Sequence, residues 1–428
     1  MQNSKNGAVE SVLSCDPLLQ QLISAYSERN ATAIESALGR VHEDVCSGSI
    51  RQGELGTADC VHVIFSILNE LLGKPYALTR VESKRKVLDY TSLTAIHFDP
   101  GNTENQHESL IERCLWVLVR ICRREMSKMS ANDTNMELLE SHQKSFEIIT
   151  DICAQYVRSS RVVLPVCWLI MVLASDSSER QFRLASANAT SLVVKIMAEH
   201  RSDVNIAEMA CRAARNLAAG DSDVVAKFVE DRICEGLVCI IRAQIRHPKA
   251  AVKNDGNNHE AIISRKKVSN SESCPVTPVG TSISDSSMQP IIERPVNETV
   301  CEAALWAIVN LSCEENVSTI LGSVGCIDAI VDVAITCRSA EVAMAAVSAI
   351  RNVSSVGTLN FSLLARTKVC EILLSNLKTY SSSIELVEVG LWALTNLACD
   401  CVLADRLGSL GAAKVVADLY YRCASAVQ

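Results

Sequence analysis

The sequence predicts an all-α protein built as a solenoid of three-helix repeats, and three observations lead to this prediction. All four tryptophans lie in similar segments, and an asparagine follows two of them at the same spacing. A second marker, centred on glycine, recurs with the same period. No stretch of any length alternates apolar and polar residues, so no sheet is expected. Internal repeats of this kind are typical of solenoids, in which each unit packs only on its neighbours.

The first marker is the pair Trp-x-x-x-Asn. It is complete in Ala304–Asn310 and in Gly390–Asn396. Partial copies, which keep only the Asn or only the Trp, are centred on Asn216, Asn352, Trp116 and Trp168. Successive Asn positions are 94, 42 and 44 residues apart, and 94 is one period of 44 plus an insertion of 50. The marker therefore predicts a repeat of 42–44 residues.

The second marker confirms the phase of the repeat. Leu321–Gly325 recurs as Leu407–Gly411, 86 residues later, which is twice 43. Glycine suits a tight turn with positive φ, and asparagine tolerates that conformation. In the other repeats the same place is filled by Asn188, Arg232 and Lys368. Each unit is thus predicted to hold a short helix before the turn, a second helix after it, and a third helix that carries Trp and Asn.

Three-helix units of this length fall in the range of armadillo and HEAT repeats. Leu305–Ser312 and Leu391–Ala398 resemble the third helix of armadillo repeats, and their Trp-x-x-x-Asn pair resembles that of the importin-α branch. The resemblance is good from about residue 160 to the end and strongest from 300. It implies a right-handed α-solenoid that serves as a non-enzymatic protein-interaction module. Over residues 1–110 it is weak, and Cys60–Leu72 is a candidate for one more third helix there.

The same reading divides the chain into four parts. Residues 1–110 are predicted to form a helical region of divergent or capping repeats. Residues 111–245 and 300–424 are predicted to be armadillo repeats. Residues 246–299 are rich in Ser, Asn and Pro and cannot bury much surface, so we expect a disordered loop inserted between the second and third helices of one repeat.

A candidate binding site follows from helix geometry, which places residues i, i+4 and i+8 on nearly one stripe. Two such stripes carry Glu, Trp and Asn in order. Asn can pair with an extended backbone, a Trp face accepts a Lys or Arg, and Glu favours cations. The predicted peptide-binding residues are Trp306, Asn310, Trp392, Asn396, Asn352, Asn216, Glu302, Glu388 and Trp116.

Alternatives remain open for this site. Asn in this place can instead brace the neighbouring helix, and Trp can pack between repeats. Arg215 and Arg351, each one residue before an Asn, point about 100° away from it and are expected to be solvated or to bridge helices.

The resemblance also implies a ligand, because these positions bind basic nuclear-localisation peptides in importin-α-like proteins. Two departures place a general interaction scaffold ahead of that alternative. Residues 1–50 contain only Lys5, Arg29 and Arg40 as cations, and Trp-x-x-x-Asn is complete in only two repeats. The predicted function is therefore a scaffold that binds an extended peptide segment in the concave groove of the solenoid. The predicted partner is a protein or peptide, with a basic peptide as the sharper alternative.

Composition narrows the remaining function classes. A net charge of −8 and a pI near 5.6 argue against a direct nucleic-acid binder. The 19 cysteines lie largely in helical apolar runs, which indicates reduced core residues and a cytoplasmic or nuclear location. The longest apolar stretch, Val162–Ala174, contains Pro165 and is too short for a membrane span. No catalytic or metal-binding motif is present, so we predict no enzymatic activity, no metal and no cofactor.

Overall fold

The computed structural model describes residues 17–47, 58–73, 96, 103–122, 144–245 and 296–426, with residues 136, 137, 139, 140 and 142. The predicted loop at 246–299 lies almost wholly outside these ranges. Its last residues are described, and they correct the predicted boundary: Asn297 caps the next helix, which begins at Glu298.

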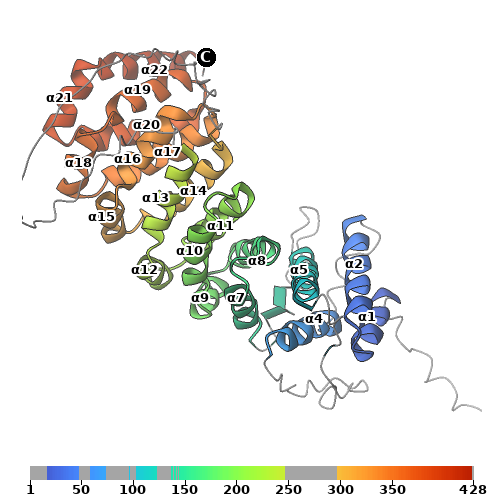
Figure 1. The fold of residues 1–428 in the computed structure, drawn as a ribbon. Helices are drawn as coiled ribbons and strands as arrows, with labels where there is room; N and C mark the ends of the chain where they lie inside the picture. The colour runs from blue at the N-terminus through green and yellow to red at the C-terminus, as the bar shows by residue number, and fades with distance from the viewer. Residues whose placement is uncertain are drawn as a thin grey trace, which may run out of the picture. The chain divides into compact units, whose positions relative to one another are not determined.

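One row of packed helices joins successive repeats through their third helices, each in contact with the next (Figure 1). In chain order this row is α2 (Ala31–Ser47), α5 (Thr103–Cys122), α8 (Ser160–Leu173), α11 (Val204–Leu217), α14 (Glu298–Leu311), α17 (Ala340–Ser354) and α20 (Ile384–Leu397).

A second row is formed in the same way by the second helices, which contact one another and the third helices. It consists of α1 (Pro17–Ser27), α4 (Ala58–Leu71), α7 (Ser145–Gln155), α10 (Ala189–Glu199), α13 (Ile233–Ile245), α16 (Cys326–Thr336), α19 (Val369–Thr379) and α22 (Ala412–Ala426). The short first helices are α9 (Ser178–Ser186), α12 (Ser222–Glu230), α15 (Glu315–Ser323), α18 (Gly357–Ala365) and α21 (Cys401–Ser409).

Rows of equivalent helices, each packed on the next repeat, define an α-solenoid of three-helix units. The predicted fold class is thereby confirmed. One assignment is corrected: Cys60–Leu72 is not a third helix, because α4 contacts α7 and lies in the second row, and α2 is the helix that packs on α5. Apolar side chains on most faces of α4 are buried, and this all-round burial makes a second helix look like a third helix in the sequence.

The turn before each second helix shows the backbone that the glycine marker predicts. Positive φ angles of 63°, 69°, 82° and 74° occur at Asn188, Arg232, Gly325 and Gly411. Lys368 differs, with φ −92°. There the Thr367 hydroxyl accepts a hydrogen bond from the Val369 N–H and donates one to a helix carbonyl, which closes the turn in another way.

The core between the rows is almost entirely aliphatic, with small contributions from buried cysteines. Fifteen cysteines in the described ranges are free thiols, and ten of these are buried. No single helix among the described ones is long and apolar enough to cross a membrane. One bent pair, α15 with α16, meets that test when the two helices are taken together, by length and composition only.

Burial predicts a sharp division in thiol reactivity. It raises the pKa of Cys122, Cys167 and Cys234 to about 12, and alkylation requires the thiolate. At pH 8 a small alkylating reagent is expected to modify exposed Cys399 and Cys239 rapidly and to leave the buried thiols unmodified until the protein is denatured. Peptide mass spectrometry over a time course measures this. Equal rates at Cys167 and Cys399 in the native protein would contradict the structure.

Candidate functional site on the third-helix surface

The two complete Trp-x-x-x-Asn motifs each present one stripe of side chains on a third helix. On α14, Glu302, Trp306 and Asn310 are all half-buried. On α20 the equivalent residues are more open, and Trp392 is 58% exposed beside an exposed Glu388. We call the solvent-accessible face of the third helices that carries these positions the third-helix surface. The structure therefore brings together the three residue types that the sequence predicts.

The asparagines of this surface share a structural role. The Nδ2 of each donates to a main-chain carbonyl near the end of the preceding third helix, across distances of 2.7–3.0 Å. The four pairs are Asn216 with Met171, Asn310 with Arg215, Asn352 with Val309, and Asn396 with Arg351. The bracing alternative is thus present in each of these four repeats. At Asn216, Asn310 and Asn396, which are half-buried, the carboxamide oxygen is still available as an acceptor for a ligand.

Asn352 differs from the other three. Its side chain is only 6% exposed. Its Oδ1 accepts a hydrogen bond from Arg351 Nε at 3.2 Å, while its Nδ2 braces Val309. Asn352 therefore offers no surface to a peptide, which corrects its inclusion among the predicted binding residues.

An arginine of the same chain already stacks on the ring of Trp306. The guanidinium of Arg215, on the preceding third helix α11, lies 5.2 Å from the Trp306 ring centroid. This distance is within the range of a cation–π contact. Arg215 therefore bridges two repeats, one of the two roles expected for it, and it does so at a position where the sequence predicts a ligand side chain.

Trp116 lies among charged side chains that are paired with one another. It borders a cavity of about 310 Å³ lined by His42, Ser109, Glu112, Arg113, Trp116 and Arg161. Glu112, the glutamate of this repeat's stripe, is paired with Arg161 Nε at 2.7 Å. Both arginines of this lining are paired, because Arg113 Nε also lies 3.3 Å from Glu35 Oε1. The charges around Trp116 are therefore balanced, and its part in binding a peptide stays a prediction.

Sequence reasoning missed a set of cations that join the first helices. The sixth residue of α9, α12 and α21 is a cation, and each donates to a main-chain carbonyl of the preceding repeat. These bonds join Arg183 Nη2 to Glu140 O, Lys227 Nζ to Ala185 O, and Arg406 Nη1 to Ala365 O and Thr367 O. The sequence does contain a signal for these contacts, because a cation recurs at the same position of the first helices, at residues 183, 227 and 406.

The ends of the second helices repeat this pattern. A polar side chain there contacts the carbonyl 42 or 43 residues earlier, in the pairs His200 with Val157, Gln244 with Arg201, and Tyr380 with Arg338. Together with the asparagines and the first-helix cations, these contacts fix the spacing of the third helices.

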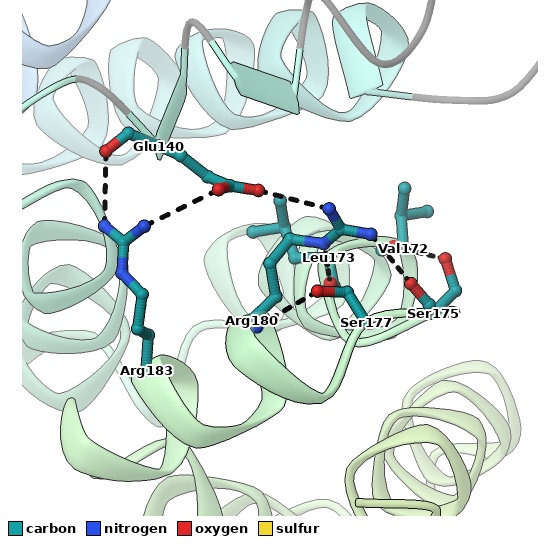
Figure 2. A network of polar contacts seen from close by, with 7 residues as sticks. All are labelled: Glu140, Val172, Leu173, Ser175, Ser177, Arg180 and Arg183. Atoms are coloured by element: carbon teal, nitrogen blue, oxygen red, sulfur yellow. Dashed lines mark hydrogen bonds and ion pairs between the residues drawn. The ribbon is translucent and has the colours of Figure 1, made fainter.

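Figure 2 shows the most connected of these contacts, where Glu140 lies between Arg180 and Arg183. Arg180 Nη1 and Arg183 Nη1 are 3.2 and 3.6 Å from the Glu140 carboxylate. Arg180 also donates through Nε to Leu173 O at 2.8 Å and through Nη2 to Ser175 O at 3.0 Å. Leu173 is the last residue of α8 and Ser175 lies two residues beyond it, where helix hydrogen bonding stops. Arg180 therefore caps one third helix and fixes the start of the next repeat.

The described residues offer no grouping of three His, Cys, Asp or Glu side chains that could hold a metal ion. A second cavity, of about 720 Å³, lies between the start of α5 and the connection from α7 to α8, with His107, Glu108 and Tyr156 among its lining residues. Burial lowers the pKa of His107 and raises that of Tyr156.

No protein-family model and no curated protein matches the sequence. Several solved structures are similar. A designed armadillo repeat protein in complex with the peptide (KR)4 is 16% identical with a TM-score of 0.47, covering 78% of this chain and 98% of its own. A second designed armadillo repeat protein is 16% identical with a TM-score of 0.48, covering 78% and 99%. A computationally designed armadillo repeat protein for modular peptide recognition is 14% identical with a TM-score of 0.46, covering 78% and 99%.

Proposed function

We propose that this protein is a non-enzymatic interaction scaffold that binds an extended protein segment across the third-helix surface. The observation that carries the proposal is the exposure of Trp392, at 58%, in line with exposed Glu388 and half-buried Asn396. Ile384, eight residues before Trp392 and therefore on the same stripe, is 76% exposed. Exposed large apolar side chains grouped with polar ones are typical of interaction sites.

The geometry suits a partner in extended conformation. Packed helices are about 8–10 Å apart, and an extended chain advances about 3.3 Å per residue. Each repeat therefore faces about three residues of the partner. The carboxamide of Asn310 or Asn396 pairs with the partner's main chain, and the Trp rings take its side chains. A single cation–π contact contributes only about 0.5–2 kcal/mol, so binding needs several repeats.

The sharper form of the proposal is that the partner is basic, as in importin-α-like adaptors of nuclear import. It is supported by exposed carboxylates at Glu385 and Glu388 beside Trp392 and by the net charge of −8. A cytoplasmic location, with nuclear entry, accompanies this form of the proposal.

The test is a titration of a fluorescently labelled Lys/Arg-rich peptide, followed by anisotropy, with wild type and Trp392→Ala. Loss of a central aromatic contact is expected to weaken binding about tenfold or more. The matched control is Val402→Ala, because Val402 is 60% exposed but lies on first helix α21. Equal affinities of wild type and Trp392→Ala would overturn the proposed site.

If no basic peptide binds wild type at micromolar concentration, the import-type form fails and the general scaffold is tested alone. A pull-down with wild type and Trp392→Ala as baits then decides it. Partners retained by wild type and lost from the variant support the third-helix surface, and partners unaffected by the change refute it.

A further inference from the structure

Two arginines occupy equivalent places in two repeats, but they make different contacts. Arg215 on α11 and Arg351 on α17 each precede an Asn by one residue, and the next third helix carries Trp306 or Trp392. Arg215 stacks over its tryptophan at 5.2 Å. Arg351 instead donates Nε to Asn352 Oδ1 at 3.2 Å, and its tryptophan is 58% exposed.

The stacked arginine occupies the place of a ligand. A Lys or Arg of a bound segment would seek the Trp306 face through the same cation–π attraction that holds Arg215. Such a ligand must first displace Arg215. Since that attraction is worth about 0.5–2 kcal/mol, self-occupation weakens a cationic ligand at Trp306 by about 2- to 30-fold. The affinity of a cationic ligand for Trp392 is not reduced in this way.

Arg215 also brings a positive charge to this position, where Glu302 of the same stripe is the carboxylate of α14. Its guanidinium is exposed, and within the described part of the chain it makes no ion pair. Stacking on an aromatic ring engages the face of a guanidinium and leaves its edge N–H groups for a carboxylate. Arg212, one turn earlier on α11, is paired with Glu208 at 2.9 Å and adds no net charge there.

We propose that Arg215 fills the cation position of Trp306 and converts it into a carboxylate position. A bound segment then places an acidic residue at Arg215 and a Lys or Arg at Trp392. This inference rests on the proposed function, because it specifies the partner of the same surface. The partner is an extended protein segment of mixed charge, not a uniformly basic one.

The spacing of the two charges follows from the repeat. From α14 to α20 there are two steps along the third-helix row, or about 16–20 Å at 8–10 Å per step. An extended chain covers this distance in about five or six residues. The partner therefore carries a basic and an acidic residue separated by about that number of positions.

Three labelled peptides of equal length test the proposal by anisotropy. One carries two lysines at this spacing, and the others carry one lysine and one glutamate, in either order, because the direction of the bound chain is open. For wild type, one mixed peptide is expected to bind about 2- to 30-fold more tightly than the dilysine peptide. In Arg215→Ala the order is expected to reverse, because Trp306 becomes open to the second lysine. Arg351→Ala is the matched control and should keep the wild-type order.

The results that would contradict this inference differ from those that would contradict the proposed function. If the dilysine peptide binds wild type at least as tightly as both mixed peptides and Arg215→Ala leaves this order unchanged, the inference is overturned while the proposed function stands. If no peptide binds any variant, the inference is overturned, and the pull-down with wild type and Trp392→Ala then decides the proposed function. The Arg215–Trp306 contact has its own test in a double-mutant cycle of unfolding with Arg215→Ala and Trp306→Leu. Non-additive effects support the contact, and strict additivity overturns the inference whatever the peptides do.

Discussion

Replacing Glu70 with alanine is expected to lower the free energy of unfolding of the N-terminal repeats by about 3–5 kcal/mol. The reason is that Glu70 neutralises Arg29, which is only 6% exposed, through an Nη1–Oε2 contact of 2.5 Å. A buried charge left without its partner costs about this much. The carboxylate also accepts hydrogen bonds from the Tyr26 hydroxyl and the Ile96 N–H. Burial, reinforced by the carboxylate, raises the pKa of Tyr26 to about 12, so this hydroxyl stays a donor throughout the physiological range.

Hydrogen exchange is the suitable measurement, because repeats in a solenoid open locally. Faster exchange is expected in α1, α2 and α4, with little change in α17 and α20. Glu28→Ala is the matched control, because Glu28 is exposed and lies next to Arg29 in sequence. A loss below about 1 kcal/mol for Glu70→Ala would show that water replaces the carboxylate, and the buried-pair account would be wrong.

Asn360→Ala is the second change with a large expected effect, a loss of about 2–4 kcal/mol. Asn360 on α18 is 1% exposed, and its Nδ2 donates to Val353 O at 2.9 Å and to Ser318 O at 3.2 Å. Truncation leaves these buried carbonyls without that donor, and each such group costs about 1–3 kcal/mol. Chemical denaturation followed by circular dichroism measures the loss. Asn205→Leu, at an exposed position of α11, is the control and should change stability by less than about 0.5 kcal/mol.

A neighbouring glycine sharpens this prediction. A Cβ added at Gly322 would lie in conflict with Asn360 Oδ1. Gly322→Ala alone is therefore expected to destabilise the protein, whereas in the Asn360→Ala background the conflict disappears and the second change costs little. Additive losses in the double variant would contradict the placement of Asn360.

The sequence was most informative where a signal recurred. The period, the three-helix unit and the positive φ angles at Asn188, Arg232, Gly325 and Gly411 were predictable, because each copy of a marker supports the others. Lys368 departs because a threonine hydroxyl closes that turn, a local bond that a repeat pattern does not contain. The α4 helix was misassigned because burial on most faces is common to second and third helices.

The residue types of the candidate site could be predicted from the sequence, but the contacts that these residues make could not. The spacing correctly placed Glu302, Trp306 and Asn310 on one face, since helix periodicity determines it. The same motif could not show that Asn352 is buried, because burial depends on the side chains of neighbouring repeats. Arg215 and Trp306 are 91 residues apart in sequence, with residues 246–295 between them, so no local pattern linked them.

The contacts that join the repeats have a direction. Asn216, Asn310, Asn352 and Asn396, the first-helix cations, and the polar residues that end the second helices all reach back to carbonyls about one repeat earlier. Gln181, whose Nε2 donates forward to Asn216 O, is an exception, and so are Tyr26 and Arg29, which donate forward to Glu70. A ribosome delivers the N-terminal residues first. Each donor that reaches back thus leaves the ribosome after the helix that accepts its hydrogen bond, so the protein is suited to fold repeat by repeat during synthesis.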